Sequence, residues 1–456
     1  MTSEEIFNLD RQYLWHPFTQ MQDWASTNPI AIVSGDGVRV RDSEGREYFD
    51  ANSSLWVTVH GHCRREIDEA IAAQLGKIAH STMLGLTHEP AARLAQKLVE
   101  IAPKGLSRVF YSDSGSTAVE IAIKMAYQTW QHRGHKNKTK CIALAEGYHG
   151  DTLGSVSVGG IGLFHGIFRP LLFTAEFAPS PSRFQSVDDA VSGIEEILKG
   201  NPGEVFAVIM EPLVQAAGGM LIAPEGTLSR VRDLCNRYDA LLIVDEVATG
   251  FGRTGTMFAC EQESVCPDLM TVAKGLTGGY LPLAATLATE EVYSAFLGNS
   301  ADLKTFYHGH SYTGNPLACA AALANLQIFA DDNVIPGLAP KIDFVRQRMS
   351  EISQNPHVGP VRQCGLMIGI PLYKNADTAE EYDWTARMGA LVCDRARALG
   401  LITRPLLDVV IFVPPLSSTR DELAAMMDII EQAIVDITQL DYDHESRYAQ
   451  RVKSAL

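Results

Sequence analysis

The middle of the chain alternates short, uninterrupted apolar runs with longer segments in which apolar residues recur every three or four positions. The short runs are typical of buried β-strands, and the spaced segments are typical of amphipathic helices. Because the two patterns alternate between about residues 105 and 290, we expect a mostly parallel sheet with helices on both faces. The expected strands are 108–111, 141–145, 205–210, 241–245 and 269–273, and the expected helices between them are 116–130, 187–198 and 228–238.

The two ends of the chain differ from this middle part. Residues 38–50 contain two alternating runs separated by a Ser-Glu-Gly turn, which predicts a β-hairpin. We therefore expect an α/β protein with a large domain at residues 61–330 and a smaller α/β domain formed by residues 1–60 and 331–456. The other expected helices are 67–79, 90–101, 316–329, 342–352, 384–399 and 422–437, and the other expected strands are 366–371 and 409–413.

Composition and charge narrow the class of protein. With 46% hydrophobic and 20% charged residues among 456, the chain has the composition of a folded, water-soluble protein. Its formal net charge of −16 disfavours binding to nucleic-acid phosphates. No apolar stretch approaches the ~20 residues that cross a bilayer, and the scattered cysteines have no metal-binding spacing. We expect a cytoplasmic protein with reduced thiols, no metal site, and no membrane or nucleic-acid partner.

Three short segments carry candidate chemistry. Residues 111–118 (YSDSGSTA) join an expected strand to a helix through small polar residues, and such a helix N-terminus binds anions such as phosphate. An ordinary helix cap explains these residues equally well. Asp245 ends the apolar run 241–245, at the strand edge where open α/β sheets bind their ligands. Lys274 follows the next apolar run, among glycines, although a lone lysine in such a place is more often a surface group.

Together the three segments predict pyridoxal phosphate chemistry. The lysine amine can attach the cofactor, the carboxylate can keep its pyridine nitrogen protonated, and the helix terminus can hold its phosphate. The first segment lacks the glycine and lysine pattern of nucleotide-binding loops, which argues against a nucleotide as the bound anion. The sequence therefore predicts an enzyme in which Lys274 and Asp245 are catalytic.

The chain resembles the class III aminotransferases of fold-type I over almost its whole length. The resemblance implies a fold-type I pyridoxal-phosphate transferase in which Tyr148 stacks on the cofactor. It also implies a homodimer with active sites at the subunit interface, in which His310 and Ser311 contact the partner subunit's cofactor phosphate and Gly309 lies near the substrate. Besides the segments above, those that carry the likeness are 146–152 (EGYHGDT), 211–215 (EPLVQ) and 308–316 (HGHSYTGNP).

Within this class, three segments resemble the family of 7,8-diaminopelargonate aminotransferases of biotin biosynthesis. That family converts 8-amino-7-oxononanoate to 7,8-diaminononanoate. The resemblance implies that Arg404 holds the acceptor's carboxylate, because a guanidinium binds a carboxylate through two parallel hydrogen bonds. We also expect Trp15, Trp56 and Tyr148 to line the acceptor's apolar chain. The three segments are 15–21 (WHPFTQM), 245–250 (DEVATG) and 403–406 (TRPL).

Two positions depart from the branch of that family that uses S-adenosylmethionine as amino donor. The pattern of that branch has tryptophan at the position of Leu55 and tyrosine at the position of Phe18. This chain therefore lacks one aromatic ring for stacking and one hydroxyl group. This pattern is similar to the branch that uses L-lysine, and we expect L-lysine to serve at least as well as S-adenosylmethionine. In full, the expected cofactor contacts are Gly115, Ser116, Tyr148, Asp245, Lys274, His310 and Ser311, and the expected substrate contacts are Phe18, Leu55, Trp56, Tyr148, Lys274, Gly309 and Arg404.

Three alternatives stay open from the sequence. Another class III enzyme, acting on a different ω-amino acid or amine, would carry the same cofactor residues. A pyridoxal phosphate enzyme of another type, such as an aminomutase, would turn over without an external donor. A non-catalytic protein that binds a phosphate ligand would have no lysine-linked cofactor. An amino-acceptor screen and the absorbance of the cofactor distinguish these possibilities.

Overall fold

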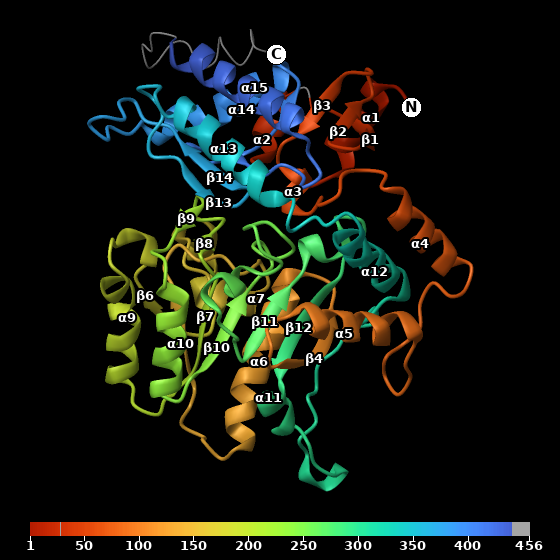
Figure 1. The fold of residues 1–456 in the computed structure, drawn as a ribbon, viewed down its shortest axis with the longest axis vertical. Helices are drawn as coiled ribbons and strands as arrows, with labels where there is room; N and C mark the ends of the chain where they lie inside the picture. The colour runs from red at the N-terminus through yellow and green to blue at the C-terminus, as the bar shows by residue number, and fades with distance from the viewer. Residues whose placement is uncertain (28, 440–456) are drawn as a thin grey trace.

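A computed structural model describes residues 1–27 and 29–439 of the chain (Figure 1). Within these residues, seven strands form a central sheet in the order β4-β12-β11-β10-β7-β5-β6. All neighbours from β11 to β6 run parallel, whereas β12 runs antiparallel to both β4 and β11. The mostly parallel sheet is therefore confirmed. Its strands are β4 (Leu106–Ser112), β5 (Lys140–Leu144), β6 (Glu176–Ala178), β7 (Val205–Met210), β10 (Leu241–Asp245), β11 (Leu269–Val272) and β12 (Ala284–Thr289).

Helices cover both faces of this sheet, as the alternation of side chains along β10 demonstrates. Leu242 and Val244 belong to one hydrophobic cluster, together with residues of α9 and α10. Leu241 and Ile243 belong to a second cluster, together with residues of α6. Because successive strand residues point to opposite faces, both faces of the strand are buried. The helices around the sheet are α4 (Arg65–Leu75), α5 (Glu89–Ile101), α6 (Gly115–His132), α7 (Leu153–Ser157), α8 (Gly162–His165), α9 (Val187–Gly200), α10 (Thr227–Arg237), α11 (Glu290–Ser294) and α12 (Pro316–Asp331).

The N-terminal part of the chain and its described C-terminal part, up to residue 439, lie together at the top of Figure 1, and they share a sheet. In that sheet, Leu401 of β15 pairs in parallel with Phe49 of β3, and β3 pairs with β2 in the expected hairpin. The domain limits at residues 60 and 330 stay a proposal, and residues 440–456 lie outside the described part. The elements here are α1 (Ser3–Tyr13), α2 (Met21–Ser26), β1 (Ile32–Asp36), β2 (Arg39–Asp42), β3 (Glu47–Asp50), α3 (Ser53–Trp56), α13 (Leu338–Ile352), β13 (Arg362–Cys364), β14 (Met367–Pro371), α14 (Met388–Ala398), β15 (Leu401–Ile402), β16 (Pro405–Leu406), β17 (Val409–Phe412) and α15 (Arg420–Thr438).

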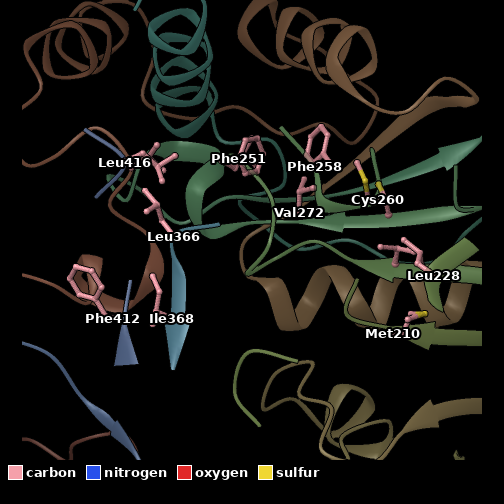
Figure 2. Close-up of a cluster of buried hydrophobic side chains, with 14 of the residues drawn as sticks. Met210, Leu228, Phe251, Phe258, Cys260, Val272, Leu366, Ile368, Phe412 and Leu416 are labelled. Atoms are coloured by element: carbon pink, nitrogen blue, oxygen red, sulfur yellow. The ribbon is translucent and has the colours of Figure 1, made fainter. Parts of the chain in front are cut away.

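One hydrophobic cluster joins this part of the molecule to the central sheet. It contains Ile368 and Phe412, from β14 and β17, as well as Val272 of β11 and Met210 of β7. Figure 2 shows Leu366 and Leu416 on the same side as Phe412 and Ile368, with Phe251 between them and Val272. The residues that follow β10 and β11 are therefore held between two packed bodies, which fixes their position.

Several expected elements differ from the structure. The helix expected at 67–79 ends at Leu75, where Gly76 serves as its C-cap. The helix expected at 384–399 begins only at Met388, because Arg387 before it has a left-handed backbone with φ of 50°. Strand β12 was not expected, since its alanine-rich sequence AATLAT has little β propensity and is buried by its neighbours.

Two general expectations concern the described residues as a whole. No described helix has the length and apolar character needed to cross a membrane. All eight cysteines lie within the described residues, and their thiols are free.

Candidate active site

A cavity of about 670 Å³ lies beyond the ends of β10 and β11. It is at the carboxyl edge of the parallel strands, where the sequence placed the candidate chemistry. The cavity brings together residues from six separate parts of the chain. Of the expected site residues, its lining includes Trp56, Gly115, Ser116, Tyr148, Asp245 and Lys274, and it also includes His149 and Glu211.

Asp245 is the last residue of β10 and is buried. Its Oδ1 atom accepts hydrogen bonds from the backbone N–H of Val247 at 3.0 Å and from the hydroxyl of Thr271, on the neighbouring strand, at 3.1 Å. Its Oδ2 atom lies 2.7 Å from Nδ1 of His149. With both oxygens fixed, the carboxylate has one orientation in the cavity.

His149 was not among the expected site residues. Its side chain is buried, and burial alone lowers the pKa of an imidazole. The hydrogen bond and the negative charge of Asp245 outweigh that effect, so the pKa of His149 is raised. The pair is therefore a charge-assisted contact in which the imidazole favours the ionised carboxylate.

Lys274 begins the short 3-10 helix η4 (Lys274–Thr277), directly beyond β11. Its backbone has φ of 43°, an uncommon left-handed conformation for a residue other than glycine. Burial lowers the pKa of its amine, while the charges of Asp245 and Glu211 oppose that change. Nζ lies 5.1 Å from the centre of the Trp56 ring. A buried amine with a lowered pKa can act as a nucleophile or a base near neutral pH.

Glu211 follows β7 and is buried in the same cavity. Its two carboxyl oxygens accept hydrogen bonds from the backbone N–H groups of Tyr148, at 3.1 Å, and Ala216, at 2.9 Å. Burial raises its pKa to about 7, and the charge of Asp245 acts in the same direction. Glu211 therefore fixes the backbone at Tyr148 and adds a titratable group to the site.

The N-terminus of α6 also lines the cavity. The Ser114 hydroxyl accepts the backbone N–H of Thr117, as in an ordinary helix cap, whereas the N–H groups of Gly115 and Ser116 have no acceptor within the helix and can bind an anion. At Gly115 a Cβ atom would lie 2.6 Å from Cγ1 of Val247, so a larger residue would not fit. The Ser116 hydroxyl lies 2.8 Å from that of Thr152 and accepts a hydrogen bond from the Thr152 N–H at 3.0 Å. At the start of α6, the backbone of Gly115 therefore packs closely against Val247, and the hydroxyl groups of Ser116 and Thr152 lie together beside it.

Tyr148 lines the cavity beside this helix start. Its hydroxyl donates a hydrogen bond to Oδ2 of Asp151 at 2.7 Å, and burial, reinforced by that bond, raises its pKa. The ring of His165 lies parallel to it, with centroids 6.1 Å apart. Tyr148 therefore presents a flat, oriented ring, which is what stacking on a planar ligand requires.

Comparison with known proteins fits this geometry. The model of the family "Aminotransferase class-III" matches residues 21–434. The chain belongs to the class-III aminotransferases. A protein of Geobacter sulfurreducens named adenosylmethionine-8-amino-7-oxononanoate aminotransferase is 49% identical over 446 residues, which cover 96% of this chain and 98% of that protein.

Solved structures of related transaminases superpose closely on this class-III aminotransferase. The adenosylmethionine-8-amino-7-oxononanoate aminotransferase of Methanocaldococcus jannaschii superposes with a TM-score of 0.92, with 44% identity over 95% of this chain and 99% of that one. The ω-transaminase of Pseudomonas jessenii in complex with PMP superposes with a TM-score of 0.91 and 31% identity, over 95% and 98% of the two chains. The fold-type I architecture and the aminotransferase activity expected from the sequence are confirmed.

Four of the expected substrate contacts lie outside the cavity lining of this aminotransferase, and one of them, Gly309, belongs to the loop 308–316. Arg404 is half-buried between β15 and β16 and lies in the neighbourhood of Tyr148. Leu55 is 49% exposed, although Trp56 beside it is buried. Phe18 is 64% exposed, and its ring lies 5.4 Å from that of Phe164, which in turn contacts Tyr148 at 6.4 Å. These residues surround the site without bordering the cavity around Lys274.

The expected phosphate loop also lies away from its own chain's cavity. Gly309 and Ser311 are exposed, and the Ser311 carbonyl accepts a hydrogen bond from His80 at 2.7 Å. The backbone N–H of His310 donates to the Thr313 hydroxyl at 3.2 Å. None of the three expected residues borders the cavity that contains Lys274. Within one subunit, the structure does not bring this loop to the site.

Arg253 is a second buried charge that sequence reasoning missed. Its side chain is 1% exposed and donates to the carbonyls of Pro414, at 2.7 Å, and Thr58, at 2.8 Å. Burial lowers its pKa to about 10, and its positive charge acts on Lys274 to lower that pKa as well. The position of Arg253 in segment 245–255, eight residues after Asp245, was the available signal.

Proposed function

We propose that this aminotransferase uses pyridoxal phosphate to transfer an amino group to 8-amino-7-oxononanoate, giving 7,8-diaminononanoate. The observation that carries the proposal is the buried Lys274 amine in one cavity with the Asp245–His149 pair. The acceptor is supported by the names of the Geobacter and Methanocaldococcus relatives, which match over almost the full length of both chains.

The residues of the cavity fit the cofactor. Asp245 is an oriented, buried carboxylate that suits a protonated ring nitrogen, and Tyr148 offers a flat ring beside it. The start of α6, at Gly115 and Ser116, offers backbone N–H groups for a phosphate. Lys274 supplies the amine that would attach the cofactor's aldehyde. The cofactor-binding role of these residues is further supported by the Pseudomonas transaminase in complex with PMP.

Each group has a distinct task. When bound, pyridoxal phosphate carries the amino group and withdraws electrons from the reacting carbon. The Nζ amine of Lys274, with its lowered pKa, takes the proton from the substrate's amine-bearing carbon and can return it elsewhere. Asp245 keeps a proton on the ring nitrogen, and His149 keeps Asp245 ionised and in place.

The acceptor needs a cation at a distance from the amine and an apolar path between them. Arg404 supplies the cation for the acceptor's carboxylate, and its position near Tyr148 places it at the edge of the site. Trp56, over Lys274, and Tyr148 provide the apolar surface. Gly309 of the partner subunit would border the same path.

For the amino donor we favour S-adenosylmethionine over L-lysine. The two relatives carry adenosylmethionine in their names, which weighs against the preference for L-lysine that Leu55 and Phe18 indicated. Both of these residues are exposed at the rim, and neither borders the cavity around Lys274. Leu55 and Phe18 therefore influence which donor enters the site, and they do not contact the reacting atoms.

We also propose a homodimer in which His310 and Ser311 complete the phosphate site of the partner subunit. Support for this proposal is that the loop 308–316 does not border its own chain's cavity, while Gly309 and Ser311 are exposed. Exposed apolar side chains occur in or next to the loop in sequence, and in the segment after His80, whose imidazole lies against the Ser311 carbonyl; they offer a surface for a second copy. They are Leu84, Leu86, Leu303, Tyr307 and Tyr312.

Half-reactions test the proposed function. The protein with its cofactor is mixed with S-adenosylmethionine, L-lysine or L-alanine, and the absorbance of the lysine-linked cofactor is followed. We expect S-adenosylmethionine to remove this absorbance, and 8-amino-7-oxononanoate to restore it with release of 7,8-diaminononanoate, measured by mass spectrometry. Restoration by a simple keto acid alone would instead favour a different ω-amine transaminase.

A further inference from the structure

The turn that carries Trp56 into the cavity is strained. Ser53, Ser54 and Trp56 have φ of 46°, 59° and 62°, although none is a glycine. Ser54 combines its φ with ψ of −78°, a conformation of the strained form of the γ-turn. Residues other than glycine adopt such a conformation only where their surroundings impose it.

Asp50, at the end of β3, is the group that contacts the most strained residue. Its Oδ1 accepts the backbone N–H of Ser54 at 2.7 Å, and its Oδ2 accepts the Ser54 hydroxyl at 2.9 Å. Oδ2 also lies 3.0 Å from Nε2 of His62. The Asp50 side chain is buried, while Ser54 is exposed, so nothing apolar presses the serine into this conformation.

Other contacts hold the two ends of the same turn. The Asn52 amide donates to the Ser54 carbonyl at 2.8 Å, and its oxygen accepts the Trp56 indole N–H at 3.0 Å. At the far end, Arg253 donates to the Thr58 carbonyl. The positive charge of Arg253 also interacts with the carboxylate of Asp50. Besides Ser54, the Asp50 carboxylate therefore interacts with His62 and Arg253, which come from different parts of the chain.

We propose that Asp50 is a positioning residue for the substrate pocket: its carboxylate holds Ser54 in the strained turn that keeps the Trp56 ring over the Lys274 amine. Asp50 does not border the cavity, and it acts only through this turn. A carboxylate suits the task because its two oxygens accept the N–H and the hydroxyl of the same serine together with the imidazole N–H. Without it, the turn relaxes and Trp56 leaves its place 5.1 Å from Nζ.

The effect on the substrate rests on the proposed function. The test therefore has three measurements, of which the first two need no substrate and do not depend on that function. The first is amide hydrogen exchange of residues 52–58 in the purified protein. The second is the fluorescence emission of Trp56. Because the chain has five tryptophans, each variant is also prepared with Trp56→Phe, and the spectrum of that form is subtracted from the spectrum of the variant. The third is the KM for 8-amino-7-oxononanoate, compared with kcat.

Asp50→Ala is expected to raise exchange in residues 52–58 and KM about tenfold each, to shift the Trp56 emission, and to change kcat by less than about threefold. Asp50→Asn, which keeps one acceptor oxygen, should have a smaller effect in the same direction. It also serves as the test if Asp50→Ala does not fold.

Two matched changes at Ser54 separate strain from a simple lost hydrogen bond. Ser54→Gly and Ser54→Ala both remove the hydroxyl, but only glycine adopts this backbone conformation without strain. We expect Asp50→Ala to change exchange and KM by less than about twofold in the Ser54→Gly protein and by about tenfold in the Ser54→Ala protein.

Equal effects in the two backgrounds, or unchanged exchange and emission in Asp50→Ala, would overturn the proposal. If the unaltered protein does not use 8-amino-7-oxononanoate, the proposed function fails, while exchange and emission still decide the role of Asp50.

Discussion

Nδ1 of His149 lies 2.7 Å from Oδ2 of Asp245, and both side chains are buried. The imidazole is the only side chain described as bonded to that oxygen, whereas Oδ1 is shared by a backbone N–H and the Thr271 hydroxyl. An ionised carboxylate at the end of a buried strand is costly unless it is paired. The pair therefore gives the buried carboxylate of Asp245 a hydrogen-bond partner and a fixed orientation in the cavity.

Asp245→Asn should abolish most of the activity while leaving the cofactor bound. A neutral amide cannot hold a proton on the cofactor's ring nitrogen, so we expect kcat to fall by at least about 1,000-fold, as for other buried catalytic aspartates. Turnover and the absorbance of the bound cofactor measure the two effects. Thr271→Val is the matched control, since it removes only one neutral hydrogen bond to the same carboxylate. Near-normal turnover of Asp245→Asn would refute the role given to Asp245.

Glu211→Gln should alter how stability depends on pH. Burial raises the pKa of Glu211 from its usual 4.5 to about 7, so the folded protein binds this proton more tightly than the unfolded chain. The stability from this group is therefore full below pH of about 4.5 and is lost as the pH rises through about 7. We expect the difference in unfolding free energy between the unaltered protein and Glu211→Gln to fall by about 1–3 kcal/mol over that window.

Urea unfolding of the protein without cofactor, at several pH values, measures this difference. Glu225→Gln, at an exposed glutamate, is the control for introducing an amide. Because glutamine has a single acceptor oxygen, the variant also leaves the N–H of Tyr148 or of Ala216 without its partner, which lowers stability equally at every pH. A difference that does not change with pH would show that Glu211 does not titrate in this range.

Asp245 and Lys274 could be located from the sequence because each follows a short apolar run, and strand ends in a parallel sheet meet at one edge. His149 could not, since nothing in its local sequence distinguishes a buried partner of Asp245 from an ordinary histidine. Its contact joins residues 96 positions apart. The segment that carries it was nevertheless identified through Tyr148.

The same limit applies to the strained turn and to β12. The conformation of Ser54 depends on a carboxylate from the preceding strand and on contacts from the C-terminal part, such as the Ser53 hydroxyl donating to the Val413 carbonyl at 2.7 Å. The direction of β12 depends on its two neighbours rather than on its own pattern. Periodicity reports which residues are buried, and it does not report which segments bury them.

Arg404→Ala should weaken use of the acceptor. If the guanidinium pairs with the carboxylate of 8-amino-7-oxononanoate, its loss should cost about 2–5 kcal/mol in kcat/KM for that substrate. Arg404→Lys keeps the charge without the two-pronged geometry, and it should give an intermediate value. Arg397→Ala, at a more exposed arginine of α14, is the control. Unchanged kinetics with Arg404→Ala would remove this residue from the site.

Leu55→Trp combined with Phe18→Tyr should favour S-adenosylmethionine over L-lysine. The added indole can stack on the adenine base or the sulfonium, which is worth about 1–3 kcal/mol for an aromatic–base contact. Both positions are exposed at the rim, so the larger side chains have room. The ratio of kcat/KM for the two donors measures the shift, which we expect to be about tenfold. The two single variants show which position carries it, and an unchanged ratio would mean that the rim does not select the donor.

Mixing two inactive variants should restore activity if each site is built from two subunits. Lys274→Ala removes the amine, and a His310→Ala, Ser311→Ala double variant removes the proposed phosphate contacts from the partner's site. A mixed dimer then has one site with both defects and one intact site. After random reassociation about half of the dimers are mixed, so we expect about a quarter of the unaltered activity. If His310 and Ser311 instead served their own chain's site, every site in the mixture would carry one defect, and no activity would return.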